Sequence, residues 1–396
     1  MPLKDIKTSI TLNAKNLIGW KTKRKIVVIS VDDYGNVRLH SRGARENMDR
    51  EGMKVYNRFD AYDTLETRED LEALYEVLTS VKDKNGRHAV FTPFALPCNI
   101  NFEKMAETGY KEYHRELLPE TFEKLTVLQP DAYEGSWSLL QEGIAKGLMV
   151  PQFHGREHLN LKVFEEKLAK RDHEVLTALR NRSYTSISSS GYPTIPYTAA
   201  FSFWNFGETR HFDEIIRDGI GAFELVYGYR PVHFNSPGTH EHPVIHKVLK
   251  EKGVKFIDAT LLKHEHLGNG KFSRKLTYTG KRNHLDQIYL VRNVVFEPTE
   301  SRSVNWVEFT MKQIEAAFRW NRPAIISSHR VNFCGHIDEQ NREVGLHALR
   351  ELLQKITRRW PDVEFMAANE LGALINSGFE SVPARSRAVG NSEYSY

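Results

Sequence analysis

The sequence predicts an α/β fold in which roughly seven or eight parallel strands form a (β/α) barrel with long loop insertions. Short apolar runs alternate with amphipathic helical segments along most of the chain. Several of the runs are apolar throughout, as expected for strands that are covered on both faces. Many strands with crossover connections favour a closed barrel, and an open doubly wound sheet is the alternative. No G-x-G-x-x-G follows the first run, so nucleotide binding has little support.

The predicted elements follow from apolar runs for strands and from helical periodicity for helices. The expected strands are 25–31, 88–95, 149–153, 232–235, 255–259, 288–296, 324–328 and 363–366. The expected helices are 68–81, 161–179, 243–252, 304–320 and 342–359. Strand and helix therefore alternate, which predicts a parallel sheet.

We expect one barrel domain over residues 21–378, preceded by an N-terminal extension at 1–20 and followed by a flexible tail at 379–396. Two stretches near 36–67 and 182–207 do not fit the alternation and are expected to be insertions above the strand ends. Long ordered loops commonly form lids or binding walls.

Composition excludes several classes of protein. The net charge of +4 is small and the basic residues are scattered, so no nucleic-acid partner is expected. Two cysteines exclude a disulfide scaffold and a four-cysteine zinc site. No long apolar stretch suggests a signal peptide or a membrane span, so we expect a cytoplasmic protein without membrane insertion. A homo-oligomer is compatible with the sequence.

Three distant segments run from apolar residues into ionisable ones. They are VISVDDYG (28–35), FHGREHLN (153–160) and IISSHRVNF (325–333). The carboxyl ends of parallel strands share one rim, where ligands bind. Together the segments predict the site of a metal hydrolase.

Residue types in these segments suit metal-assisted hydrolysis. His154 and His158 are four residues apart, which can place both imidazoles on one side. Asp32 and Asp33 are adjacent at a strand end, so one can bind a cation while the other faces the attacking water. His329 is placed to protonate the leaving amine. Taken alone, each motif is also compatible with chance spacing among 17 His or with an ordinary Asp turn.

The order of these motifs resembles the NodB-type polysaccharide deacetylases, which are carbohydrate esterase family four. The D-D-Y-G and H-L-N sequences are also similar to YdjC-type carbohydrate deacetylases. The resemblance extends over about residues 25–374 but consists of short segments, including the Pro-containing Asn235-Ser236-Pro237-Gly238.

The resemblance implies a distorted (β/α) barrel that binds a divalent ion through Asp33, His154 and His158. Zinc is the expected ion, with nickel, cobalt and manganese as alternatives. Asp32 would be the general base and His329 the general acid in hydrolysis of an N-acetyl or O-acetyl group. The implied substrate is a carbohydrate or glycoconjugate, and the missing signal peptide favours a small or intracellular one.

The chain departs from the family pattern at Asn235, where the family has an Arg that pairs with the catalytic Asp. Arg156 and Arg330 are candidates to supply that cation from elsewhere. Asp258 matches the position of an acid that tunes the base. The missing Arg also supports a different hypothesis, a catalytically silent carbohydrate-binding barrel.

Further residues have weaker claims to the site. Arg292 and Glu297 bring ionisable groups to another strand end, although an ordinary ion pair would explain them. His240 follows the Pro237 turn and could line the pocket, or could begin a helix. Trp204 lies in an aromatic-rich insertion and could stack on a sugar or pack on the barrel. A metal-independent glycoside hydrolase that pairs Asp32 or Asp33 with Glu297 is the second enzymatic alternative.

Overall fold

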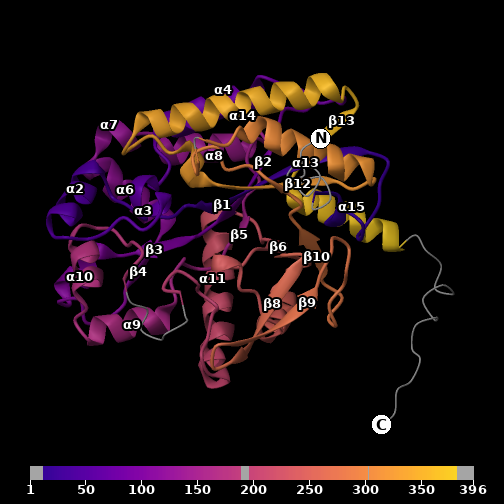
Figure 1. Ribbon diagram of the computed structural model, residues 1–396. Helices are drawn as coiled ribbons and strands as arrows, with labels where there is room; N and C mark the ends of the chain where they lie inside the picture. Colours follow the sequence, from indigo (N-terminus) through magenta and orange to yellow (C-terminus); the bar gives the residue numbers. More distant parts are fainter. Residues whose placement is uncertain (1–11, 189–195, 302, 381–396) are drawn as a thin grey trace, which may run out of the picture.

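The computed structural model describes residues 12–188, 196–301 and 303–380 (Figure 1). A nine-stranded sheet has the order β10-β7-β6-β5-β2-β1-β12-β11, with β13 also paired to β1. Its pairings are all parallel. The strands of this sheet are β1 (Lys25–Tyr34), β2 (Phe91–Ala95), β5 (Gln152–Phe153), β6 (His233–Phe234), β7 (Phe256–Ala259), β10 (Ile288–Val291), β11 (Val294–Val295), β12 (Ala324–His329) and β13 (Val363–Met366).

The segment that carries β10 and β11 closes the barrel. β10 pairs with β7, whereas β11 pairs with β12, and only Arg292 and Asn293 separate the two strands along the described chain. One stretch of chain therefore contains both the first and the last strand of the sheet order. The barrel is distorted at Arg292 and Asn293, where this stretch passes from one strand to the other. β13 pairs with Lys25–Val28 of β1, and β2 begins its pairing at Ile29. These pairings confirm the predicted distorted (β/α) barrel of parallel strands.

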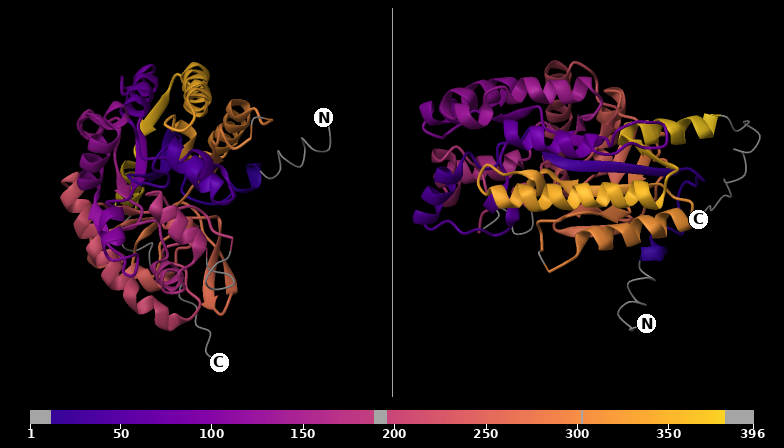
Figure 2. Two further views of the ribbon diagram at one scale, coloured as in Figure 1. Left: turned by 90° about the vertical axis from the view of Figure 1, so that its left-hand side faces the viewer. Right: turned by 90° about the horizontal axis from the view of Figure 1, so that it is seen from above.

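Helices surround the strands, as the left view of Figure 2 shows. The longest, α14, packs between α4 and α13 (Figure 1). The helices are α2 (Arg42–Arg50), α3 (Arg58–Tyr62), α4 (Arg68–Thr79), α5 (Phe102–Glu107), α6 (Leu118–Leu128), α7 (Pro130–Tyr133), α8 (Ser136–Ala145), α9 (Leu161–Ala169), α10 (His173–Arg180), α11 (Phe212–Tyr227), α12 (His246–Glu251), α13 (Trp306–Arg319), α14 (Glu339–Arg359) and α15 (Ala368–Glu380). Two antiparallel pairs lie outside the barrel sheet: β3 (Cys98–Ile100) with β4 (Arg115–Leu117), and β8 (Leu262–Gly268) with β9 (Lys271–Leu276).

One predicted helix is wrong in its extent. The helix expected at 161–179 is two helices, α9 and α10. Arg171 between them has φ of 53°, a left-handed conformation that ends a helix. Asp172 then caps α10, because its side chain accepts a hydrogen bond from the Val175 N–H. The amphipathic periodicity continues across this break and conceals it.

The two expected insertions differ in how much structure they contain. Residues 36–67 hold α2 and α3, which were not predicted. Residues 189–195 of the second insertion lie outside the described residues, as do most of the expected tail and the first eleven residues. Within the described ranges, no helix combines the length and apolar character needed to cross a bilayer.

β1 sets the position of the functional residues. It pairs with β2, β12 and β13, and every residue from Ile26 to Tyr34 is buried. Asp32 and Asp33 are therefore delivered into the protein at the carboxyl end of the strand, with 6% and 4% of their surface exposed.

Candidate metal centre

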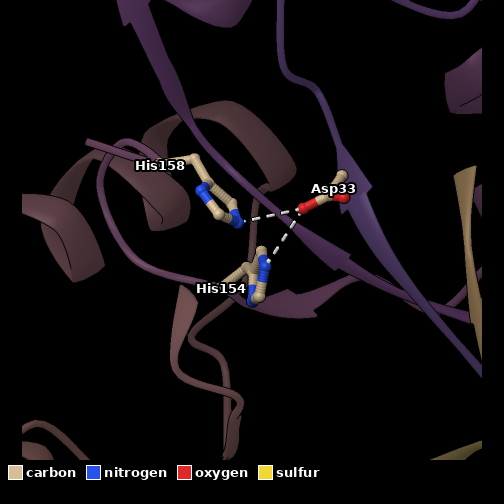
Figure 3. Close-up of side chains that lie close together, drawn as sticks. All are labelled: Asp33, His154 and His158. Atoms are coloured by element: carbon tan, nitrogen blue, oxygen red, sulfur yellow. Dashed lines mark ion pairs between the residues drawn. The ribbon is translucent and has the colours of Figure 1, made fainter. Parts of the chain in front are cut away.

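Asp33, His154 and His158 meet at this end of the barrel (Figure 3). One ligand atom from each lies within 4.8 Å of the others. Asp33 Oδ1 is 3.4 Å from His154 Nε2 and 3.2 Å from His158 Nε2. All three residues are buried. The structure thus brings together the three residues that the sequence suggested as metal ligands.

The backbone turns Asp33 away from Asp32. The register between β1 and β2 shifts between Val31 and Tyr34, and Asp33 has φ of 76°. Asp is among the few residue types that tolerate this left-handed conformation. The irregularity lets the two adjacent carboxylates of Asp32 and Asp33 face different partners, as expected for a metal ligand next to a general base.

His154 and His158 lie on the loop between β5 and α9, and not on a helix. Gly155 between them has φ of 109°, and an added Cβ there would lie 3.1 Å from Pro237 Cγ. His154 Nδ1 is 2.9 Å from the Asn235 carbonyl oxygen, which can only accept a hydrogen bond. The proton of neutral His154 is therefore on Nδ1, and its Nε2 lone pair is directed towards Asp33.

These residues fit a divalent cation. Asp33 Oδ1 and His154 Nε2 are buried and have no hydrogen-bond partner among the described residues, which is costly unless something else satisfies them. Ligand atoms about 2.0–2.2 Å from one tetrahedral ion lie roughly 3.3–3.5 Å apart, close to the observed separations. Two imidazoles and one carboxylate are typical of a catalytic ion with further coordination positions.

Asp32 is held by Arg292 and not by the expected candidates. Arg292 Nη1 and Nη2 donate to the two oxygens of Asp32 at 2.7 and 2.8 Å, and its Nε donates to Asp258 Oδ2 at 2.6 Å. The other oxygen of Asp258 is 2.8 Å from His233 Nε2. Asn235 Nδ2 donates to Asp32 Oδ1 at 2.9 Å. Asn235 therefore contacts the expected base, while Arg292 supplies the missing charge.

The proposed role of Arg156 or Arg330 as that cation is wrong. Arg156 pairs with Glu157 and Asp218. Arg330 is fully committed to the buried pair Asp63 and Glu66. Both arginines lie near motif residues in sequence, but neighbouring acids have already neutralised them.

Arg292 determines the charge state of Asp32. Burial by itself would raise the pKa of Asp32, but the charge and hydrogen bonds of Arg292, with a smaller effect of His329, outweigh this effect and lower the pKa. Asp32 is therefore a carboxylate at neutral pH.

Replacing Arg292 with Met would leave two buried carboxylates without their shared cation. We expect this change to lower the free energy of unfolding by about 3–5 kcal/mol. Arg292→Lys keeps the charge but cannot contact both Asp32 and Asp258 in the same geometry, so its loss should be smaller. Urea unfolding of both variants measures the difference, and a Met variant as stable as the parent would contradict this account of the network.

His329 is fixed by Glu297. His329 Nδ1 lies 2.7 Å from Glu297 Oε1, and its Nε2 is 3.9 Å from Asp32 Oδ2. Arg58 and Asn332 both donate to the other oxygen of Glu297. Burial lowers the pKa of His329, but Glu297, Asp32 and Asp33 more than offset this and raise the pKa to about 9. His329 is therefore a protonated imidazolium at neutral pH.

A cavity of about 240 Å³ joins these groups. It is lined by Asp32, Asp33, His154, His158 and His329, together with Arg38, Asn57, Phe59, Ser186, Thr198, Ser236 and Gly238. Both insertions thus contribute to its wall. The insertion at 36–67 was expected above the strand ends, but its lining residues Arg38, Asn57 and Phe59 were not singled out, because no motif spacing links them to the metal ligands.

Several accessory candidates lie outside this lining. Three of them contact the catalytic candidates from outside the lining. Arg292 binds Asp32 and is itself bound by Asp258, and Glu297 binds His329. Pro237 packs against Gly155. His240 contacts Ser202 and His266, and the Trp204 backbone contacts Glu208 and Asn269. The structure does not bring Arg156, His240 or Trp204 to the described wall of the cavity.

No protein-family model matches the chain, and no curated protein matches it. Solved structures with a similar arrangement include one described as a probable polysaccharide deacetylase from Pseudomonas aeruginosa PAO1. It has a TM-score of 0.45 and 11% identity, over 89% of this chain and 91% of the other. The Puue allantoinase has a TM-score of 0.44 and 11% identity, over 92% and 94%. A 4-alpha-glucanotransferase from Thermococcus litoralis has a TM-score of 0.42 and 12% identity, over 88% of this chain but only 40% of that enzyme. The geometry of the site itself therefore carries the functional argument.

Proposed function

We propose that this protein is a metal-dependent hydrolase that removes an acetyl group, most directly an N-acetyl group, from a carbohydrate or glycoconjugate. The observation that carries the proposal is the convergence of Asp33, His154 and His158 beside one ionised Asp and one protonated His in a single cavity. The motif order supports the acetylated carbohydrate as the substrate class.

Asp33, His154 and His158 would hold the ion, with zinc as the expected metal. Such an ion polarises a carbonyl oxygen and lowers the pKa of water when it is bound. Asp32 takes the proton of the attacking water, because it is ionised and Arg292 fixes its orientation. Asp32 is the general base in this proposal.

His329 supplies a proton to the leaving nitrogen as the tetrahedral intermediate breaks down. Its pKa of about 9 keeps the imidazole protonated at neutral pH, and its hydrogen bond to Glu297 fixes the ring. Arg292 and Glu297 are positioning residues, since each acts through the group that it contacts.

The two alternatives lose their main support. A glycoside hydrolase would need Glu297 free to reach a substrate, but His329, Arg58 and Asn332 engage both of its oxygens. The catalytically silent barrel was suggested by the missing Arg at position 235, and Arg292 provides that charge from the link between β10 and β11.

Acetate release from a panel of N-acetylated and O-acetylated sugars tests the proposal. Protein loaded with zinc should release acetate from at least one substrate class, and removal of the metal with EDTA should stop the release until zinc is restored. Activity that is unchanged after complete metal removal would overturn the proposed function.

Replacing Glu297 with Gln should shift the pH dependence of the reaction. The general acid works while His329 is protonated, so activity should fall as pH rises through its pKa of about 9. Loss of the Glu297 charge removes the main influence that raises this pKa. The alkaline limb of kcat/KM should therefore move down by about 1–3 pH units. Asn332→Ala, which leaves the Glu297 charge in place, should move it less, and equal shifts in the two variants would contradict the assigned role.

A further inference from the structure

We propose that Arg38 is a substrate-binding residue that recognises an acidic group, a carboxylate or a phosphate, on a small acetylated sugar. This inference rests on the proposed function and specifies its substrate class. Arg38 lines the same cavity as the metal ligands but belongs to the first insertion, and the catalytic roles above do not use it.

Arg38 is buried with its hydrogen-bonding capacity incompletely used. Only 5% of its surface is exposed. Its Nη2 donates to Asp60 Oδ1 at 3.0 Å and to Ser186 Oγ at 3.3 Å. Neither Nε nor Nη1 has a hydrogen-bond partner among the described residues. Unsatisfied donors on a buried guanidinium are costly, and an acceptor on a bound ligand would remove part of that cost.

The guanidinium is held in place before any ligand binds. Its central carbon lies 5.2 Å from the centre of the Phe59 ring and 5.7 Å from that of Tyr184. Asp60 is itself fixed, because the backbone N–H of Ser186 donates to its Oδ1 at 2.9 Å. A side chain that is already immobilised loses little conformational entropy on binding a ligand. This arrangement is suited to recognition.

The chemistry of Arg38 selects an acceptor. Arginine carries only donors and remains charged at any ordinary pH, so its strongest partners are carboxylates and phosphates. Of the acids on the cavity wall, Asp32 is held by Arg292, and Asp33 belongs to the proposed metal ligands. Asp60 pairs with Arg38 through Nη2 alone, so the remaining donors of the guanidinium are left for a ligand.

Cavity size limits the rest of the ligand. Sites for drug-sized ligands usually have volumes of about 300–1,000 Å³. The cavity of about 240 Å³ is smaller and has room for about one sugar residue beside the metal ligands. The charge of Arg38 and the size of the cavity together point to a single acidic, acetylated amino sugar.

Calorimetric binding to the zinc-loaded Asp32→Asn protein tests this inference without turnover. The probes are N-acetylglucosamine, its 6-phosphate and the corresponding 6-carboxylate. At least one anionic probe should bind about tenfold or more tightly than the neutral sugar, as expected for a charge-assisted hydrogen bond. The tighter of the two anions identifies the acidic group.

Arg38→Met combined with Asp60→Asn removes the cation without leaving a buried carboxylate unpaired. In the Asp32→Asn background, this change should weaken the preferred anion about 10- to 100-fold and the neutral sugar less than threefold. Asp60→Asn alone keeps Arg38 and should retain the preference for the anion, and a melting curve checks that each variant is folded. Equal affinity for the three probes, absence of anion binding, or an anion preference that survives loss of Arg38 would each overturn the inference.

Acetate release separates failure of this inference from failure of the proposed function. Release from neutral sugars without any anion preference would overturn the role of Arg38 alone. Arg38-dependent anion binding without hydrolysis of any acetylated sugar by zinc-loaded parent protein would support the binding site and overturn the proposed deacetylation.

Discussion

Replacing His154 with Ala should remove the bound metal and lower kcat by at least about 10³-fold, the largest effect expected from a single change in this protein. His154 provides one of three ligand atoms, and its Nδ1 is already committed to the Asn235 carbonyl. The two ligands that remain hold an ion far less tightly. Metal analysis of protein purified without a nickel column, together with kcat on the best acetylated substrate, measures both effects.

His240→Ala is the matched control for that experiment. His240 is another partly buried imidazole close to the site in sequence, but it contacts Ser202 and lies outside the described cavity wall. This variant should keep one metal ion per chain and most of its activity. Equal metal loss in the two variants would contradict the assignment of His154 as a ligand.

Asp32→Asn should have the second largest effect, and it should lower activity without removing the metal. The substitution preserves the size of the side chain but removes the carboxylate that accepts the proton from water. We expect kcat to fall by about 10²–10⁴-fold. Asp32 is not one of the three clustered ligands, so the metal content should stay at one ion per chain.

Paired metal analysis and steady-state kinetics distinguish the adjacent carboxylates. Asp33→Asn should lose both metal and activity, whereas Asp32→Asn should lose activity alone. An Asp32→Asn enzyme with more than about one tenth of the parent kcat would exclude Asp32 as the general base.

The barrel strands were predictable because buried parallel strands are short apolar runs with clear ends. The predicted run at 288–296 contains both β10 and β11. That β10 pairs with β7 while β11 pairs with β12 depends on the tertiary fold, so the run alone did not predict it. The helices between residues 102 and 145 were not predicted. The break at Arg171 was also missed, since helical periodicity does not report a local left-handed residue.

The metal ligands were predictable for a related reason. Strand ends in a parallel barrel converge, so Asp33 near the carboxyl end of β1 and His154 after β5 could be placed together from sequence alone. The partner of Asp32 could not be identified in this way. Arg292 is 260 residues away along the chain, and only the barrel closure brings it to the carboxylate. Arg58, which donates to Glu297, could not be identified from sequence either, because 239 residues separate the two.

In anomalous diffraction from crystals of the protein loaded with one equivalent of zinc, we expect one strong peak about 2.0–2.2 Å from Asp33 Oδ1, His154 Nε2 and His158 Nε2. A peak bound elsewhere on the chain, or no peak between these three atoms, would contradict a metal centre at this position.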